Sequence, residues 1–160
     1  MRILILFISF FSNADQLKPI AETVEDLGKK LPEYSENEIM KQEAIFIFTK
    51  CAGASLLMSD EEKDFWDKNA NGFLRLSILA DIGDHDVDLE EYTENIKRLN
   101  SKFTEIIYKK RDEYSELVRD INPEDFSGTP PPYALLNSDL DYCLSYTETE
   151  LWKEVNFDLL

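Results

Sequence analysis

The sequence is poor in the residues and motifs that usually carry catalysis. It contains one histidine, two cysteines and five glycines in 160 residues. It has no glycine-rich phosphate loop, no CxxC pair, no HExxH metal motif and no GxSxG nucleophile motif. These absences argue against nucleotide-dependent, thiol-redox, zinc-protease and serine-hydrolase chemistry. We therefore predict no enzyme activity, no catalytic residue and no cofactor.

Basic residues are also scarce. The 17 lysines and arginines are outnumbered by 33 aspartates and glutamates, so the net charge is −16. Such a charge repels nucleic acid phosphates and anionic membranes and attracts basic proteins. The imbalance is greatest from Asp120 to Leu160, where nine carboxylates accompany only Lys153. We expect no nucleic acid ligand, and we expect a protein partner with a basic surface.

The longest apolar run stands at the N-terminus. Met1 and Arg2 precede "ILILFISFF" and the small-residue sequence "SNA", which ends at Ala14. This order of charge, apolar run and small residues is typical of a cleavable signal peptide. The run is too short to span a bilayer of about 30 Å as a helix.

The resulting prediction is a signal peptide at 1–14 and one acidic helical domain at 15–160. The mature protein would be periplasmic or secreted, with no stable membrane anchor. The alternative is a cytoplasmic protein that folds the apolar N-terminal segment into its core.

Two cysteines, Cys51 and Cys143, remain after removal of a signal peptide. An even pair in an oxidising compartment favours a disulfide. In the cytoplasmic alternative, both would be buried thiols that pack as small apolar side chains.

Helix signals recur along the chain after residue 14, whereas strand signals are weak. Apolar residues spaced three and four apart predict amphipathic helices. Five are expected: 15–30, 36–58, 60–82, 88–121 and 138–153. Capping boxes at Ser35 and Ser59 predict the starts of the second and third helices.

Two helices carry an open question about continuity. The third either runs unbroken or is interrupted at 69–72, and the fourth has a candidate kink or break at 109–111. Four of the six prolines lie in 122–137, which predicts a loop there. The fold class is thus all-α: a single-domain bundle of about five helices with a proline-rich loop before the last.

The stretch "DKNANG" (67–72) resembles the start of a calcium-binding EF-hand loop. Asp67, Asn69 and Asn71 fill the first three ligand positions, and a glycine follows where that loop turns sharply. The match then fails, because position 12 is Ile78 and not glutamate. Any calcium site here would be weak, and the same residue types also suit a turn or a helix break.

A second acidic run places Asp84, Asp86 and Asp88 on alternate positions beside His85. Clustered oxygen ligands attract hard cations such as Ca²⁺, and a histidine could add a ligand for Zn²⁺. The commoner explanation is an exposed connection whose acids favour the N-terminus of the following helix. Neither run defines a firm metal site.

The sequence therefore predicts a small exported acidic helical protein that is non-catalytic and binds a basic protein, in the manner of an inhibitor or immunity protein. The main alternative is a cytoplasmic acidic charge mimic or regulatory protein. A metal-responsive module that uses one of the two acidic runs is a weaker alternative.

Overall fold

The computed structural model describes residues 19–20, 36–60, 62–82, 89–125 and 127–155. The predicted signal peptide (1–14), most of the first predicted helix and the capping box at Ser35 lie outside these residues.

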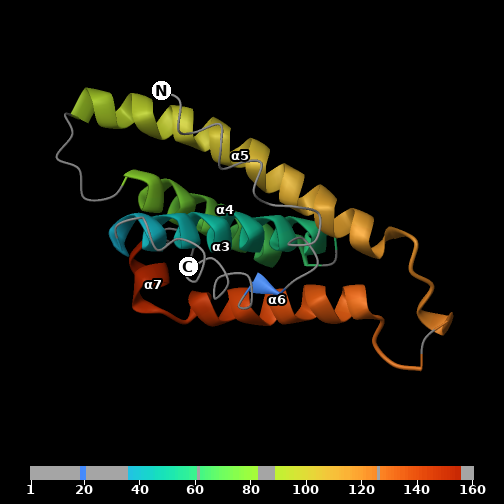
Figure 1. Ribbon diagram of the computed structural model, residues 1–160. Helices are drawn as coiled ribbons and strands as arrows, with labels where there is room; N and C mark the ends of the chain where they lie inside the picture. The colour runs from blue at the N-terminus through green and yellow to red at the C-terminus, as the bar shows by residue number, and fades with distance from the viewer. Residues whose placement is uncertain (1–18, 21–35, 61, 83–88, 126, 156–160) are drawn as a thin grey trace.

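The described part of the chain is helical and contains no strand. Its elements are α3 (Glu36–Met58), α4 (Lys63–Ile82), α5 (Leu89–Arg119), the short 3₁₀ helix η2 (Pro123–Asp125), α6 (Pro131–Thr147) and α7 (Glu150–Val155). Figure 1 shows α3 and α4 in the middle of a bundle, with α5 along one side and α6 along the other. The all-α bundle predicted from the sequence is confirmed, but only part of the loop predicted at 122–137 precedes α6, because residues from Pro131 onward are helical.

Helix α3 is the central element because it is apolar on nearly every face. It contacts α4, α5 and α6, and Cys51, Ala52 and Ala54 within it are fully buried. Gly53 lets α5 approach closely: a Cβ at this position would lie 2.6 Å from Lys110 Cβ and 2.9 Å from the backbone nitrogen of the next residue in α5.

The apolar interior has two parts. The main cluster is built mostly by α3, α4 and α5, and its most fully buried rings are Phe73 and Phe103. Helices α6 and α7 add only Cys143 and Trp152 to its buried residues. The second, smaller cluster joins Ala54, Tyr114, Leu136 and Leu140.

The predicted capping box at Ser59 is wrong. The Ser59 hydroxyl donates to the Leu56 carbonyl at 3.0 Å and so closes the end of α3. Helix α4 begins at Lys63 instead, and its Trp66 N–H donates to the Glu62 carbonyl at 3.1 Å. The serine ends one helix where the motif predicted that it would start the next.

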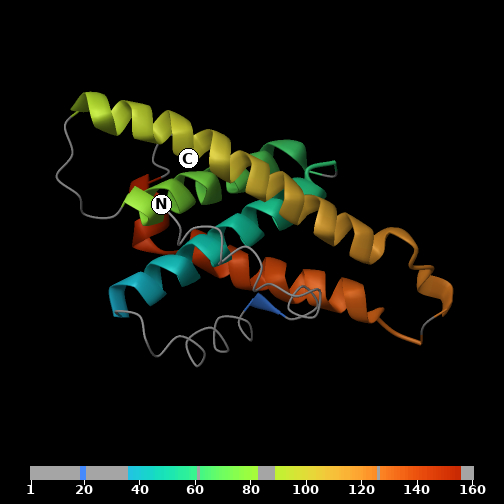
Figure 2. The ribbon, with the colours of Figure 1, turned by 45° about the horizontal axis from the view of Figure 1, so that its top comes forward.

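Helix α5 is continuous over 31 residues, with no break at 109–111. Figures 1 and 2 show it running along the whole bundle. Lys110 explains the continuity in part, because its backbone packs against Gly53 of α3 and its side chain bonds to Glu113 at 2.8 Å.

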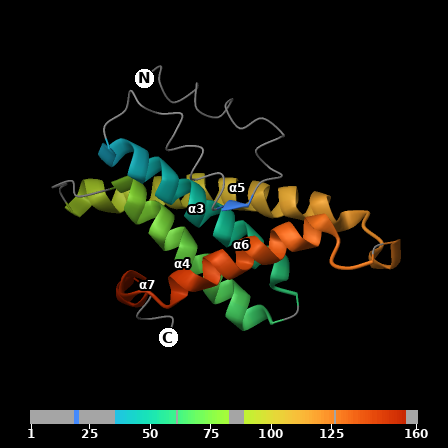
Figure 3. The ribbon, with the colours of Figure 1, turned by 60° about the horizontal axis from the view of Figure 1, so that its bottom comes forward.

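The last predicted helix (138–153) is two helices in the structure. Helix α6 starts seven residues earlier, because Pro131 and Pro132 occupy its first turn, where a missing amide hydrogen costs little. It ends at Thr147, and Thr149 caps α7 by accepting the Trp152 N–H at 3.2 Å. Figure 3 shows α6 crossing α3, with α7 at its far end.

Candidate functional site

The residues of the predicted EF-hand loop are helical. Residues 67–72 lie inside α4, where successive side chains point about 100° apart. Asp67 and Asn71 therefore lie on one face of the helix, whereas Asn69 points to the opposite, buried side, so the three side chains cannot surround one ion. Asn71 Nδ2 donates to the Asp67 carbonyl at 2.9 Å, as a residue four positions on in a helix can. The loop hypothesis for these residues is wrong, and the third predicted helix is unbroken.

Gly72, which had suggested the sharp turn of that loop, has a packing role instead. A Cβ at this position would collide with the indole of Trp152 on α7. The same indole packs on Phe73, with the ring centroids 4.9 Å apart. The glycine thus makes room for α7 against α4.

The second acidic run, with Asp84, Asp86 and Asp88, lies outside the described residues. At its edge, Asp81 faces Lys41 and Lys102, each 3.6 Å away. In the part of the chain that the structure describes, no three histidine, cysteine or acidic side chains lie together as a metal site would need.

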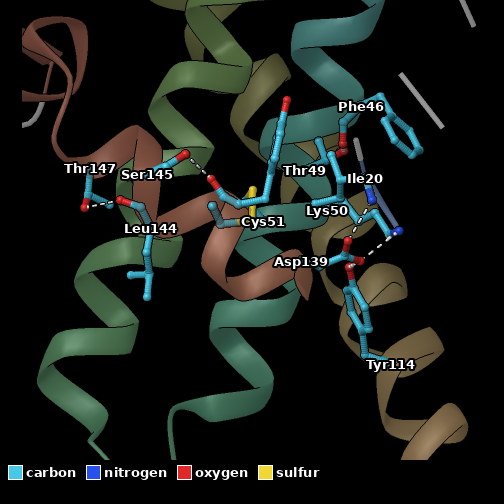
Figure 4. The surroundings of a disulfide bond; sticks show 12 residues. Ile20, Phe46, Thr49, Lys50, Cys51, Tyr114, Asp139, Leu144, Ser145 and Thr147 are labelled. Carbon is cyan, nitrogen blue, oxygen red and sulfur yellow. Dashed lines mark hydrogen bonds and ion pairs between the residues drawn. A yellow bond between two sulfur atoms is a disulfide. The ribbon is translucent and has the colours of Figure 1, made fainter. Parts of the chain in front are cut away.

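The structure brings together a group of buried polar side chains that the sequence analysis missed. Asp139 on α6 is fully buried, and its Oδ2 lies 3.1 Å from Lys50 Nζ on α3. The Tyr114 hydroxyl on α5 donates to the same oxygen at 2.6 Å. The backbone N–H of Ile20 donates to Oδ1 at 2.7 Å. As Figure 4 shows, one carboxylate joins four parts of the chain.

Burial dominates the electrostatics of this buried polar cluster. It lowers the pKa of Lys50, while the Asp139 carboxylate acts in the opposite direction. Burial also raises the pKa of Tyr114 well above its ordinary value, and Asp139 adds to that rise. Tyr114 therefore keeps its proton and remains a donor. The rings of Phe46 and Tyr114 lie 5.8 and 5.6 Å from Lys50 Nζ and add cation–π attraction.

The cysteine pair lies beside this cluster. Cys51 follows Lys50 on α3, and Cys143 stands one turn after Asp139 on α6. The two cysteines form a disulfide, with an S–S distance of 2.01 Å and Cα atoms 5.5 Å apart. The pairing expected from the sequence is thus the pairing that the structure contains.

The cluster has the properties of a structural centre. Its charged side chains are at most 5% exposed, and its carboxylate is satisfied by an ammonium, a hydroxyl and an amide. These atoms are therefore closed off from solvent in the structure. The cluster therefore accounts for how α6 is held, and the surface is the place to look for binding.

The chain from 120 to 150 is strongly acidic. We call its exposed carboxylates the acidic surface; they extend from the end of α5 and η2, at one end of α6, to the α6–α7 turn at its other end. These exposed carboxylates belong to Asp120, Glu124, Asp125, Asp141, Glu148 and Glu150. No lysine or arginine occurs between Arg119 and Lys153. Lys153 bonds to Glu150 at 2.7 Å, whereas Asp141 and Glu148 form no ion pair with the described residues.

Comparison with known proteins adds no family: no family model, no curated protein and no solved structure matches the chain. Among the described helices, none is long and apolar enough to cross a membrane.

Proposed function

We propose that this protein is exported and acts without catalysis, by binding a basic protein on its acidic surface as an inhibitor or immunity protein would. The observation that carries the proposal is the run of exposed carboxylates from Asp120 to Glu150 with no basic residue among them. A surface of one sign attracts a partner of the opposite sign before contact and so raises the association rate.

The framework behind this surface supports the same function. Helix α6 is held to α3 by a disulfide and to three parts of the chain by Asp139. Asp141 on its exposed side and Glu148 at its C-cap stand seven residues apart, which is about two turns of helix. A framework fixed in this way loses little conformational entropy when a partner binds.

Charge reversal on the acidic surface tests the proposal. Asp141→Lys with Glu148→Lys reverses two exposed carboxylates that form no ion pair with the described residues. The matched control is Glu94→Lys with Glu105→Lys on α5, which makes the same change in net charge at two other exposed positions.

The measurement is capture of basic proteins from an envelope or secreted extract, followed by the association rate with the captured protein. We expect the wild-type and control proteins to bind at low salt, and the reversal on α6 to slow association by about 10-fold or more. High salt should weaken all of them. If the two double variants lose binding equally, or if binding does not depend on salt, the proposal fails.

Intact mass of the natively produced protein tests the export step. A chain that starts after Ala14, with both cysteines protected from alkylation until reductant is added, supports export. A chain that retains Met1 and has two free thiols would favour the cytoplasmic charge mimic instead.

A further inference from the structure

Helix α6 contributes little to the main apolar cluster. The buried residues of that cluster lie on α3, α4 and α5, apart from Ile20, Cys143 and Trp152. The other buried apolar residues of α6 are Leu136 and Leu140, which belong to the second, smaller cluster. Tyr142 and Tyr146 pack on the main cluster while only half-buried. The apolar core that α3, α4 and α5 form is therefore largely complete without α6.

The strongest attachments of α6 are concentrated within one helical turn. Asp139 meets Lys50, and Cys143 meets Cys51, so two adjacent residues of α3 hold both ends of this turn. We call these four residues the α6 clasp (Figure 4). A buried ion pair repays the loss of its hydration only in part. The disulfide is therefore the component of the α6 clasp whose contribution to holding α6 on α3 is not offset by a loss of hydration.

The chain keeps α6 tethered even if it leaves α3. A turn of two residues joins it to α7. Helix α7 is anchored on α4 independently, because the Trp152 indole fills the space that Gly72 leaves open. Helix α6 can therefore detach from α3 while its C-terminal end remains attached to the bundle.

We propose that the Cys51–Cys143 disulfide is what keeps α6 docked, and that its reduction releases α6 as a unit while α3, α4 and α5 remain folded. The reductant is a dithiol. One thiolate of the dithiol attacks a protein sulfur, which forms a mixed disulfide and releases the other cysteine. The second thiol of the dithiol then attacks the dithiol sulfur of this mixed disulfide and releases the remaining protein cysteine. Two electrons and two protons pass to the protein, which gains two thiols, and the dithiol becomes a disulfide.

Both sulfurs are buried, since Cys51 and Cys143 are 0% and 2% exposed. Attack by a thiolate therefore requires α6 to open first, so native reduction is slow and speeds up under conditions that loosen α6. The consequence for binding rests on the proposed function: Asp141 and Glu148 move with α6, so reduction would break up the acidic surface.

Hydrogen exchange measured by mass spectrometry tests the release without any partner, so its failure is separate from a failure of the proposed function. The samples are the oxidised wild-type protein, the same protein reduced in dithiothreitol, and Cys51→Ala/Cys143→Ala without reductant. We expect protection in 131–147 to fall by about a thousandfold in the last two samples. Peptides from 63–82 and 89–119 should keep their protection.

Three results would overturn the proposal. The first is unchanged protection of 131–147 after reduction. The second is equal loss of protection in all helices of the reduced wild-type protein, because the disulfide would then hold the whole bundle together. The third is that Cys51→Ala/Cys143→Ala is unfolded in all helices while the reduced wild-type protein shows no loss of protection confined to 131–147.

Discussion

The substitution Asp139→Asn tests the electrostatics of the buried polar cluster with almost no change in shape. The amide oxygen can still accept the Ile20 N–H, which now donates to Oδ1 at 2.7 Å. The amide nitrogen replaces Oδ2 and faces the two donors that this oxygen serves, the Lys50 ammonium at 3.1 Å and the Tyr114 hydroxyl at 2.6 Å. The variant thus removes the carboxylate that neutralises a buried ammonium.

The magnitude follows from distance and burial. Two unit charges 3.1 Å apart attract by about 5 kcal/mol at an effective dielectric constant of about 20. Loss of one partner of a buried pair typically costs about 3–5 kcal/mol. We expect the free energy of unfolding to fall by this amount, which is a large part of the roughly 5–15 kcal/mol that holds a domain together.

Urea unfolding followed by circular dichroism measures the loss from the midpoint and slope. The control is Asp141→Asn, an exposed position two residues further along α6, where we expect a change within about 0.5 kcal/mol. A second variant, Lys50→Met/Asp139→Leu, removes both charges and should lose less than Asp139→Asn, because no buried charge is left without its counterion.

Two outcomes would refute this account. A loss below about 1 kcal/mol for Asp139→Asn would mean that water or relaxation screens the pair. An equal loss in the variant without charges would assign the effect to packing.

The remaining predictions concern close helix packing and a buried phenol. Gly53→Ala should destabilise the protein by about 1–3 kcal/mol in urea unfolding, since its Cβ meets Lys110 Cβ at 2.6 Å; Gly128→Ala, which meets nothing within 4 Å, should be neutral or gain up to about 1 kcal/mol. If both glycines tolerate alanine equally, α3 and α5 are not in such close contact. Because the pKa of Tyr114 is raised in the folded protein, unfolding releases its proton above pH 10 and stability should fall as the pH rises. Tyr114→Phe should lack this part of the decline in the free energy of unfolding, about 1.4 kcal/mol per pH unit. Urea unfolding of both proteins from pH 9 to 11 measures the difference, and parallel stability curves for the two proteins would contradict the assignment.

The sequence alone locates a helix where the spacing of its apolar residues defines the whole element. Helix α3 is a long apolar stretch and α5 a long amphipathic one, so both could be located within a few residues of their observed ends. The sequence predicts the start of α6 seven residues too late, because the prolines at 130–132 favour a loop. Proline is also favourable in the first turn of a helix. The choice between a loop and a helix start at these prolines depends on contact with α3.

The local signals at 67–72 pointed to a loop or turn that the fold does not contain. Asparagine and glycine are poor helix formers, each costing up to about 1 kcal/mol relative to alanine. Packing overrides this preference, since Gly72 receives the Trp152 indole and Ala70 and Phe73 are buried.

The buried polar cluster carried a signal that pattern reading did not use. Asp139 lies on the face of α6 that also presents Leu136, Leu140 and Cys143, and Lys50 stands inside the apolar part of α3. A charge at such a position indicates a buried partner. The sequence does not say which partner, because Asp139 and the exposed Asp141 look alike until α3 is placed beside them.

The α6 clasp joins residues that lie far apart in the sequence, and this separation affects how the chain folds. Synthesis delivers Lys50 and Cys51 long before Asp139 and Cys143, since the two cysteines have a sequence separation of 92. Contacts of such large sequence separation slow folding, since a long stretch of chain must be ordered before they form. A ribosome-bound chain that stops short of residue 139 would carry the Lys50 ammonium on α3 with no carboxylate from α6 to meet it, so α6 can dock only after the last quarter of the protein has been made.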